Sequence, residues 1–300
     1  VTNVSKTPWV QETRPQFLLL AVLLVAHGSA LAAWQGSFDW LHAVLAGLAL
    51  VLMHGSVNAL NDWHEWSKPG IDNATPRTPF SGGSGLIPAG KITAKQALIV
   101  GVVTLAVGVA IGLYLAWVAG WQLLAIGGAG ALMIVLYTPV FNKLGLGEIF
   151  AGLGLGLLPV LGTYFLLTGR FDAVAWVSGI PAFCLTYNLL LLNEFPDVEA
   201  DKAGGRTHMV TLLGKKGARW LYAAMEIAAY VAIVVGVVAG VLTPWALLGL
   251  GGAIFAARAI KGALTDYESF EKTVAAQGAN VVAVLSTNAL MFIGYLIAAL

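Results

Sequence analysis

The sequence predicts an all-α membrane protein, a polytopic bundle of about nine transmembrane helices around a central cavity. Hydrophobic residues make up 58% of the 300 residues and charged residues only 10%, whereas a soluble domain carries about 25% charged residues. The charges are also clustered, and the apolar runs between them approach the length of about 20 residues that a helix needs to cross a bilayer. We treat residues 1–300 as a single transmembrane domain.

Nine apolar runs are long enough to span a membrane. We place them at about 17–35, 40–60, 96–118, 121–139, 148–168, 173–193, 219–240, 244–261 and 279–300. The first run is expected to be a retained span, because it lacks a convincing small-residue cleavage site. The single cysteine, Cys184, lies in an apolar run and is expected to be a packing residue.

The basic residues support this order of spans. With the N-terminus in the cytoplasm, fifteen of the sixteen Lys and Arg residues fall in cytoplasmic segments, and Arg170 alone falls outside. This asymmetry is typical of membrane proteins, so we expect an integral protein of a prokaryotic cytoplasmic membrane. A net charge of +1 gives no sign of nucleic-acid binding. Two long loops, about 61–95 and 193–218, then face the cytoplasm and are expected to carry the functional site.

Amide and acidic side chains gather where the second span ends. Asn58, Asn61, Asp62 and Glu65 follow one another there, and Asp72 comes soon after. If the helix continues, Asn58, Asp62 and Glu65 fall on one broad face. Polar groups at the end of an apolar span are costly to place, and they tend to be functional.

A second cluster follows the sixth span. Asn193, Asp197 and Asp201 repeat every four residues, which again places them on one helix face. Carboxylates this close repel one another unless a cation lies between them. Oxygen ligands of this kind suit Mg²⁺, which also keeps water and substrate phosphates as ligands. The two clusters therefore predict a site for Mg²⁺ ions bridged by a diphosphate.

Basic residues near each cluster are candidates for binding phosphate, because an Arg can grip a phosphate with two parallel hydrogen bonds. The candidates are Arg77, Lys143, Lys202 and Arg206. The alternative interpretation is that they are ordinary positive charges of cytoplasmic loops. Tyr137 offers a hydroxyl and an aromatic face, although ordinary packing explains many such residues.

The two acidic clusters resemble the motifs of a known family. Residues 61–65 (NDWHE) are similar to the first motif, NDxxD, of the UbiA superfamily of intramembrane aromatic prenyltransferases. Residues 197–201 (DVEAD) are similar to its second motif, DxxxD. Residues 137–139, 146–148 and 158–164 look like the branch that prenylates 1,4-dihydroxy-2-naphthoate in menaquinone synthesis. The likeness covers about residues 15–215.

The resemblance implies Mg²⁺-dependent transfer of an isoprenyl group from an isoprenyl diphosphate to an aromatic small molecule, in a site that a long lipid tail can enter from the bilayer. The implied metal ligands are Asp62, Glu65, Asp72, Asp197 and Asp201. The implied diphosphate contacts are Asn58, Asn61, Arg77, Asn193, Lys202 and Arg206. The implied catalytic residues are Asp62, Tyr137, Lys143 and Asp197.

Three departures from the family pattern leave the acceptor open, and one of them is the unexpected Trp63-His64 pair within the first motif. Glu65 stands where Asp is usual, and Thr207-His208 replaces a more usual basic-Thr pair. Other acceptors of the superfamily are hydroxybenzoate, homogentisate, chlorophyllide, haem and a glycerolipid precursor. An ion-coupled transporter is the alternative from a different class, but a transporter more often places its charges near the middle of discontinuous helices.

Overall fold

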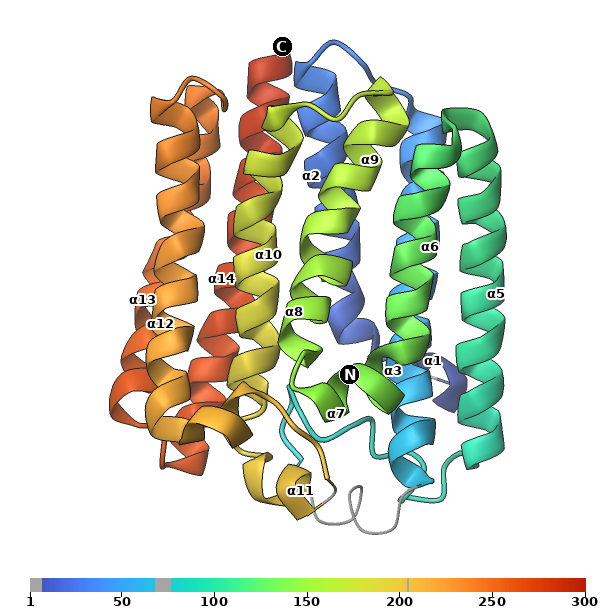
Figure 1. Ribbon diagram of the computed structural model, residues 1–300, viewed down its shortest axis with the longest axis vertical. Coiled ribbons are helices and arrows are strands. Elements are labelled where there is room, and N and C mark those ends of the chain that lie inside the picture. The colour runs from blue at the N-terminus through green and yellow to red at the C-terminus, as the bar shows by residue number, and fades with distance from the viewer. Residues whose placement is uncertain (1–6, 68–76, 204) are drawn as a thin grey trace, which may run out of the picture.

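The protein is described by a computed structural model covering residues 7–67, 77–203 and 205–300. Across these residues the chain is helical and contains no strand. Long helices run side by side along one axis (Figure 1). Within the described chain, nine helical segments are long and apolar enough to cross a membrane, which confirms the predicted number. They are Pro15–Trp34, Trp40–Trp66, Ala94–Ala119, Trp121–Leu144, Gly147–Thr168, Ala173–Asn193, Met209–Val238, Pro244–Thr265 and Phe270–Ala299.

Several of these segments combine shorter elements. A short helix, α1 (Pro8–Glu12), precedes the first span. The first five spans contain η1 (Pro15–Phe17), α2 (Leu18–Trp34), α3 (Trp40–Trp66), α5 (Ala94–Ala119), α6 (Trp121–Leu136), η2 (Tyr137–Phe141), α7 (Asn142–Leu144), α8 (Gly147–Gly152), η3 (Leu153–Leu157) and α9 (Leu158–Thr168). The remaining elements are α10 (Ala173–Asn193), α11 (Val198–Ala203), α12 (Met209–Val238), η4 (Pro244–Gly252), α13 (Ala253–Thr265) and α14 (Phe270–Ala299).

Three helices extend beyond the apolar runs that predict them. Helix α3 continues to Trp66, α12 begins at Met209, and α14 begins at Phe270. The extra turns are polar, as Lys215 and Lys216 illustrate in α12. An apolar run reports only the part of a helix that lies in hydrocarbon, so hydropathy places these helix ends six to ten residues too far inside the spans.

The apolar core lies where α2, α9, α10, α12 and α14 meet. Helix α2 packs against α3, α9 and α14, and α10 packs against α8 and α12. Leu24, Leu185 and Tyr295 are fully buried in this core. Helix α6, by contrast, has no buried residue, because its apolar side chains face the bilayer or the interior cavity.

Buried polar side chains also connect the central helices. His27 Nε2 on α2 lies 2.7 Å from Ser178 Oγ on α10, and this hydroxyl lies 2.8 Å from Tyr295 Oη on α14. His27 Nδ1 lies 3.2 Å from Asn288 Oδ1. Hydrogen bonds between helices contribute to association inside a membrane, where the hydrophobic effect does not drive helices together.

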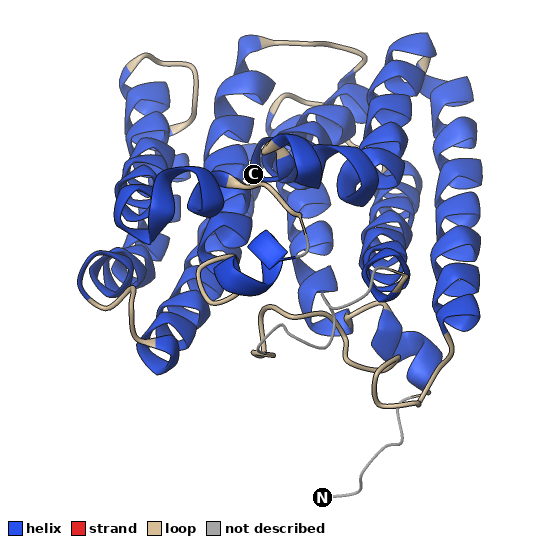
Figure 2. Ribbon diagram, turned by 60° about the horizontal axis from the view of Figure 1, so that its bottom comes forward, coloured by secondary structure: helices blue, strands red, loops and turns tan. Residues whose placement is uncertain are grey.

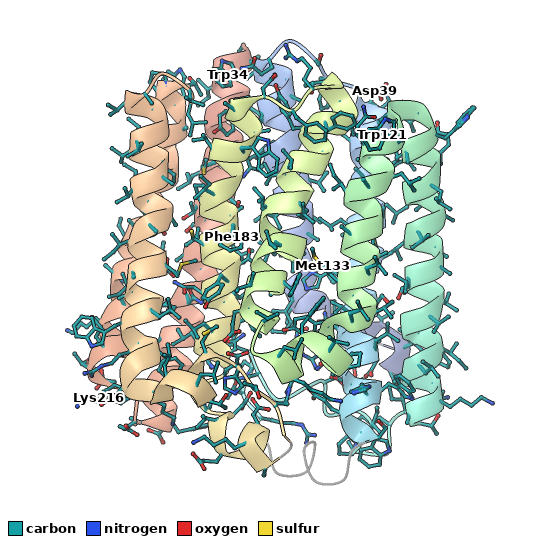
Figure 3. All side chains as sticks on the ribbon, viewed as in Figure 1. Trp34, Asp39, Trp121, Met133, Phe183 and Lys216 are labelled. Carbon is teal, nitrogen blue, oxygen red and sulfur yellow. The ribbon has the colours of Figure 1, made fainter. Side chains whose placement is uncertain are left out.

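Charged and polar side chains gather at the end of the bundle where α3 and α10 finish and α11 lies, which we call the polar end. Figure 3 shows side-chain nitrogen and oxygen atoms concentrated there, with Lys216 at this end and Trp34, Asp39 and Trp121 near the opposite end. Figure 2 brings the polar end forward and shows the loops and short helices that cover it. The described residues that the sequence predicts for the site belong to elements at this end.

Candidate active site

The first acidic motif occupies the last turns of α3. Asn61 Nδ2 donates a hydrogen bond of 3.0 Å to Glu65 Oε1, as their spacing on a helix predicts. The Thr138 hydroxyl donates to Asn61 Oδ1 at 2.9 Å, which ties α3 to η2. Asp62 and Glu65 are both buried. Hydrogen bonds within α3 and from η2 therefore fix the position of the Asn61 side chain.

The N-terminal segment closes over the same helix end. Arg14 forms an ion pair with Asp62, and the Asn58 amide donates to the Thr13 carbonyl at 2.9 Å. The Ser84 backbone N–H donates to Asp62 Oδ2 at 2.8 Å. Burial lowers the pKa of Arg14, but the charges of Asp62, Glu65 and Glu12 and the hydrogen bond to Asp62 together raise it above its ordinary value.

The second motif follows the end of α10. Asn193 Nδ2 donates to the Phe80 carbonyl at 3.2 Å, and the Ser81 hydroxyl lies 3.5 Å from Asp197 Oδ1. Burial, and then the charge of Asp201, raise the pKa of Asp197 to about 7. The loop that follows α3 in the sequence thus covers the second motif, where negative charge is in excess.

Arg206 brings the two motifs together. Its Nη1 atom lies 2.8 Å from Glu65 Oε1 and 3.1 Å from Asp201 Oδ1. Burial lowers the pKa of Arg206, but the charges of these two carboxylates raise it by more, so the residue remains a cation. The pKa of Asp201 lies below its ordinary value, because the hydrogen bond from His208 and the charge of Arg206 outweigh the effect of burial.

A cavity of about 360 Å³ lies above these groups and extends between the helices. The predicted site residues that line it are Asn58, Asn61, Glu65, Tyr137, Asn193, Asp197, Asp201 and Arg206. Further charged residues line it, among them Arg14, Glu194 and His208, and apolar side chains such as Leu20, Met53, Ile126, Met133 and Leu158 line much of the rest. The cavity therefore joins an acidic floor to a hydrocarbon-like chamber inside the bundle.

Two breaks in helical geometry shape this cavity. The η2 segment is a π-helical turn that contains Pro139 and presents Tyr137 to the cavity. The η3 segment is a second π-helical turn, in which Leu155 has non-helical dihedral angles. Such turns appear frequently at functional sites. Each π-helical turn has a larger radius than an α-helical turn. The two turns lie between α6 and α7 and between α8 and α9.

Four of the predicted residues that the structure describes do not line the cavity, and one of them is Asp62, which is held by Arg14 and by the Ser84 N–H. Lys143 is exposed at the end of α7, and Lys202 is exposed with its Nζ atom 3.5 Å from Glu199. Arg77 lines a neighbouring cavity and donates to the Gly82 carbonyl at 3.2 Å. Asp72 lies outside the described residues.

The site also contains charged residues to which the sequence patterns assign no role. They are Glu12, Arg14, Glu148, Glu194 and His208. Glu12 accepts a hydrogen bond of 2.8 Å from the Ser84 hydroxyl. Glu194 belongs to the second acidic cluster but not to its four-residue repeat, and Glu148 and His208 enter only through the family resemblance. No regular spacing marks any of the five residues.

The residues present fit Mg²⁺. Glu65, Asp197 and Asp201 offer carboxylates to one cavity, and the buried Asn193 Oδ1 atom has no hydrogen-bond partner. Mg²⁺ prefers oxygen ligands of this kind. Burial, and then the charge of Asp201, raise the pKa of Asp197, and a cation bound beside it would stabilise the ionised carboxylate.

Fold and site together define an integral membrane enzyme with an acidic site at one end of a helical bundle and an apolar chamber inside it. The sequence profile of the UbiA prenyltransferase family matches residues 19–296. The chain belongs to this family and is a prenyltransferase, which agrees with the resemblance in its motifs.

Curated relatives cover most of the chain. The 1,4-dihydroxy-2-naphthoate octaprenyltransferase of Mycobacterium leprae is 30% identical over 260 residues, which are 86% of this chain and 85% of the relative. The enzyme of the same name from Bacillus subtilis is 29% identical, over 78% of this chain and 75% of the relative.

Solved structures share the fold. A UbiA homologue from Archaeoglobus fulgidus bound to GPP and Mg²⁺ has a TM-score of 0.62 at 15% identity and covers 94% of this chain and 99% of that one. A UbiA homologue from Aeropyrum pernix has a TM-score of 0.65 at 20% identity and covers 90% of this chain and 97% of that one.

Proposed function

We propose that the protein uses Mg²⁺ to transfer an isoprenyl group from an isoprenyl diphosphate to 1,4-dihydroxy-2-naphthoate, as a step of menaquinone biosynthesis. One observation carries the reaction type: Arg206 joins the two acidic motifs at the floor of a cavity that is lined mainly by apolar side chains away from this floor. The names of the relatives from Mycobacterium leprae and Bacillus subtilis support the acceptor.

The acidic floor is proposed to bind the diphosphate. Asp62, Glu65, Asp72, Asp197 and Asp201 would hold the metal. When bound, Mg²⁺ supplies Lewis-acid neutralisation of the leaving group. Arg206 adds a fixed positive charge, while Asn58, Asn61 and Asn193 offer amide hydrogen bonds to phosphate oxygens. In this proposal the positive charges of Arg77, Lys143 and Lys202, which lie outside the cavity lining, attract and stabilise the diphosphate.

The apolar chamber is proposed to protect the reaction from water. The bond between the allylic carbon and the diphosphate oxygen breaks, and its electron pair leaves with the diphosphate. The Tyr137 ring faces the same cavity and can stabilise the allylic cation, because aromatic faces attract cations. The acceptor ring then forms the new carbon–carbon bond, and its carboxylate leaves as carbon dioxide and returns an electron pair to the ring.

Product formation by the purified protein in lipid tests this proposal. The assay supplies Mg²⁺, 1,4-dihydroxy-2-naphthoate and isoprenyl diphosphates of several chain lengths, with other superfamily acceptors in parallel. We expect a prenylated naphthoquinol that disappears when EDTA is added. Turnover with only a different acceptor would refute 1,4-dihydroxy-2-naphthoate as the substrate but would still support Mg²⁺-dependent prenyl transfer. No diphosphate release with any pair, from folded protein, would refute both.

A further inference from the structure

A fully buried carboxylate lies just behind the cavity floor with one oxygen lacking a partner. Glu148 on α8 has no solvent exposure. Its Oε1 atom accepts a hydrogen bond of 2.6 Å from the Met209 backbone N–H, whereas its Oε2 atom has no hydrogen-bond partner. An ionised oxygen in this position is costly unless a cation or a proton compensates it.

Two further groups converge on this carboxylate. Glu148, Glu194 and His208 each present a ligand atom within 4.8 Å of the other two. The three residues come from α8, from the residue after α10 and from the residue before α12. Burial, and then the charge of Glu148, raise the pKa of Glu194 well above its ordinary value. A hydrogen bond between the two carboxyl groups raises this pKa further, while the charge of Arg206 lowers it. The pair is therefore stabilised either by a shared proton or by a bound cation.

The orientation of His208 is the one found at metal centres. Its Nδ1 atom lies 3.3 Å from Glu194 Oε2, toward the acidic pair, and its Nε2 atom lies 3.2 Å from Asp201 Oδ2. A histidine that binds a metal through one ring nitrogen almost always donates its other ring N–H to a carboxylate or a carbonyl. Asp201 occupies that outer position here.

We propose that Glu148, Glu194 and His208 form a second metal site, for a divalent transition-metal ion such as Zn²⁺, Mn²⁺ or Co²⁺. An imidazole nitrogen with two carboxylates suits these ions, whereas Mg²⁺ takes oxygen ligands. Two ionised carboxylates and one divalent ion are electrically neutral together, which removes the cost of burying the pair. The site is distinct from the Mg²⁺ site at Asp197 and Asp201 and does not depend on the identity of the acceptor.

The site would have a structural consequence and an open coordination position. It would fasten α8, the end of α10 and the start of α12 to one ion. Through Nε2 of His208 it would also fix the carboxylate of Asp201 in the active site. Glu194 and His208 line the main cavity but Glu148 does not. A fourth ligand of the proposed ion would therefore come from the cavity side, as water or a substrate oxygen.

Binding of Co²⁺ to the full-length protein in detergent tests this proposal without an activity assay. Co²⁺ is titrated in excess Mg²⁺ and followed by its visible absorption, which reports coordination number and nitrogen ligation. We expect one ion per chain, displaced by Zn²⁺. Glu148→Gln and His208→Asn should each weaken binding by at least about ten-fold, and Asp201→Asn by about ten- to 100-fold through the outer shell.

Two variants serve as controls. Glu199→Gln changes an exposed acid at the same end of the bundle, and Asp62→Asn changes the Mg²⁺ site; both should bind Co²⁺ like the unsubstituted protein. Absence of Co²⁺ and Zn²⁺ binding, or binding that Glu148→Gln and His208→Asn leave unchanged, would overturn the proposal and indicate a proton shared by the two glutamates. Circular dichroism and gel filtration establish folding, and Glu194→Gln replaces any variant that fails this check.

Discussion

Arg206 is the one side chain that contacts both acidic motifs among the described residues, through Glu65 and Asp201. All three groups are largely shielded from water, so their charges are weakly screened. Removing one partner from such a set leaves uncompensated charge in a dry place, which costs more than the ion pair itself contributes.

Arg206→Ala should therefore destabilise the protein by about 3–5 kcal/mol. Thermal unfolding in detergent measures this as a lower Tm, and Arg206→Lys should lose less because it keeps the charge. Added Mg²⁺ should raise the Tm of Arg206→Ala more than that of the unsubstituted protein, because the ion neutralises the same carboxylates. Lys202→Ala, at an exposed position, is the matched control. An unchanged Tm would mean that Arg206 does not hold the motifs together.

Asp62→Ala and Asp197→Ala should each lower turnover by at least about 100-fold while leaving the protein folded, because each removes a proposed metal ligand. The prenyl transfer assay in lipid measures this effect. Glu199→Ala is the control, since the Glu199 side chain is 84% exposed and lies in the same motif as Asp197. Full activity in either aspartate variant would contradict a site built from two motifs.

The second motif does not form the single helix face that its spacing predicts, because α10 ends at Asn193 and α11 begins only at Val198, after Asp197. On α3, by contrast, Asn61 and Glu65 lie one helical turn apart, and this spacing alone brings their side chains together. Arg14 and Glu148 could not be found this way, because Arg14 meets Asp62 across 48 residues and Glu148 meets Met209 across 61. Only packing of distant segments creates these contacts.

At the scale of elements, helix interruptions and glycine contacts place α8 and η3 against α10. A Cβ atom on Gly156 would lie 2.6 Å from the Ala182 carbonyl oxygen, so η3 approaches the backbone of α10 directly. Small residues permit such contact between membrane helices. Apolar runs predict that these spans exist, but they do not reveal π-helical turns, which do not change hydropathy.

Gly156→Ala should destabilise the protein by about 1–3 kcal/mol, because backbone atoms cannot make room as a flexible side chain can. Thermal unfolding is again the measurement. Gly128→Ala on α6 is the matched control: its added Cβ would meet nothing within 4 Å, and alanine favours a helix over glycine by up to about 1 kcal/mol. Equal Tm values for the two variants would contradict close packing at Gly156.

At the scale of the whole molecule, most charged side chains, both acidic and basic, gather at the polar end of the bundle, and the opposite end carries few (Figure 3). The number and order of spans follow from hydropathy and from the distribution of Lys and Arg, and the structure agrees with both. We propose on the basis of the positive-inside rule that the polar end faces the cytoplasm.

Cysteine labelling of sealed cells tests this orientation. Cys184 is the only cysteine in the sequence and is buried, so the unsubstituted protein should resist a membrane-impermeant maleimide and provides the control. Arg170→Cys, at the end opposite the acidic site, should be labelled on intact cells. Lys216→Cys should be labelled only after the membrane is opened. The reverse pattern would invert the assigned topology.

If Asp62 binds the metal as proposed, its ion pair with Arg14 makes the N-terminal segment and the metal compete for one carboxylate. Their equilibria are then reciprocal: if a bound cation weakens the docking of this segment by some factor, docking weakens the cation's affinity by the same factor. A released Arg14 would be free to meet an incoming anion, because it lines the main cavity. Cation binding at Asp62 and release of the N-terminal segment that carries Arg14 would therefore be governed by the same coupling free energy.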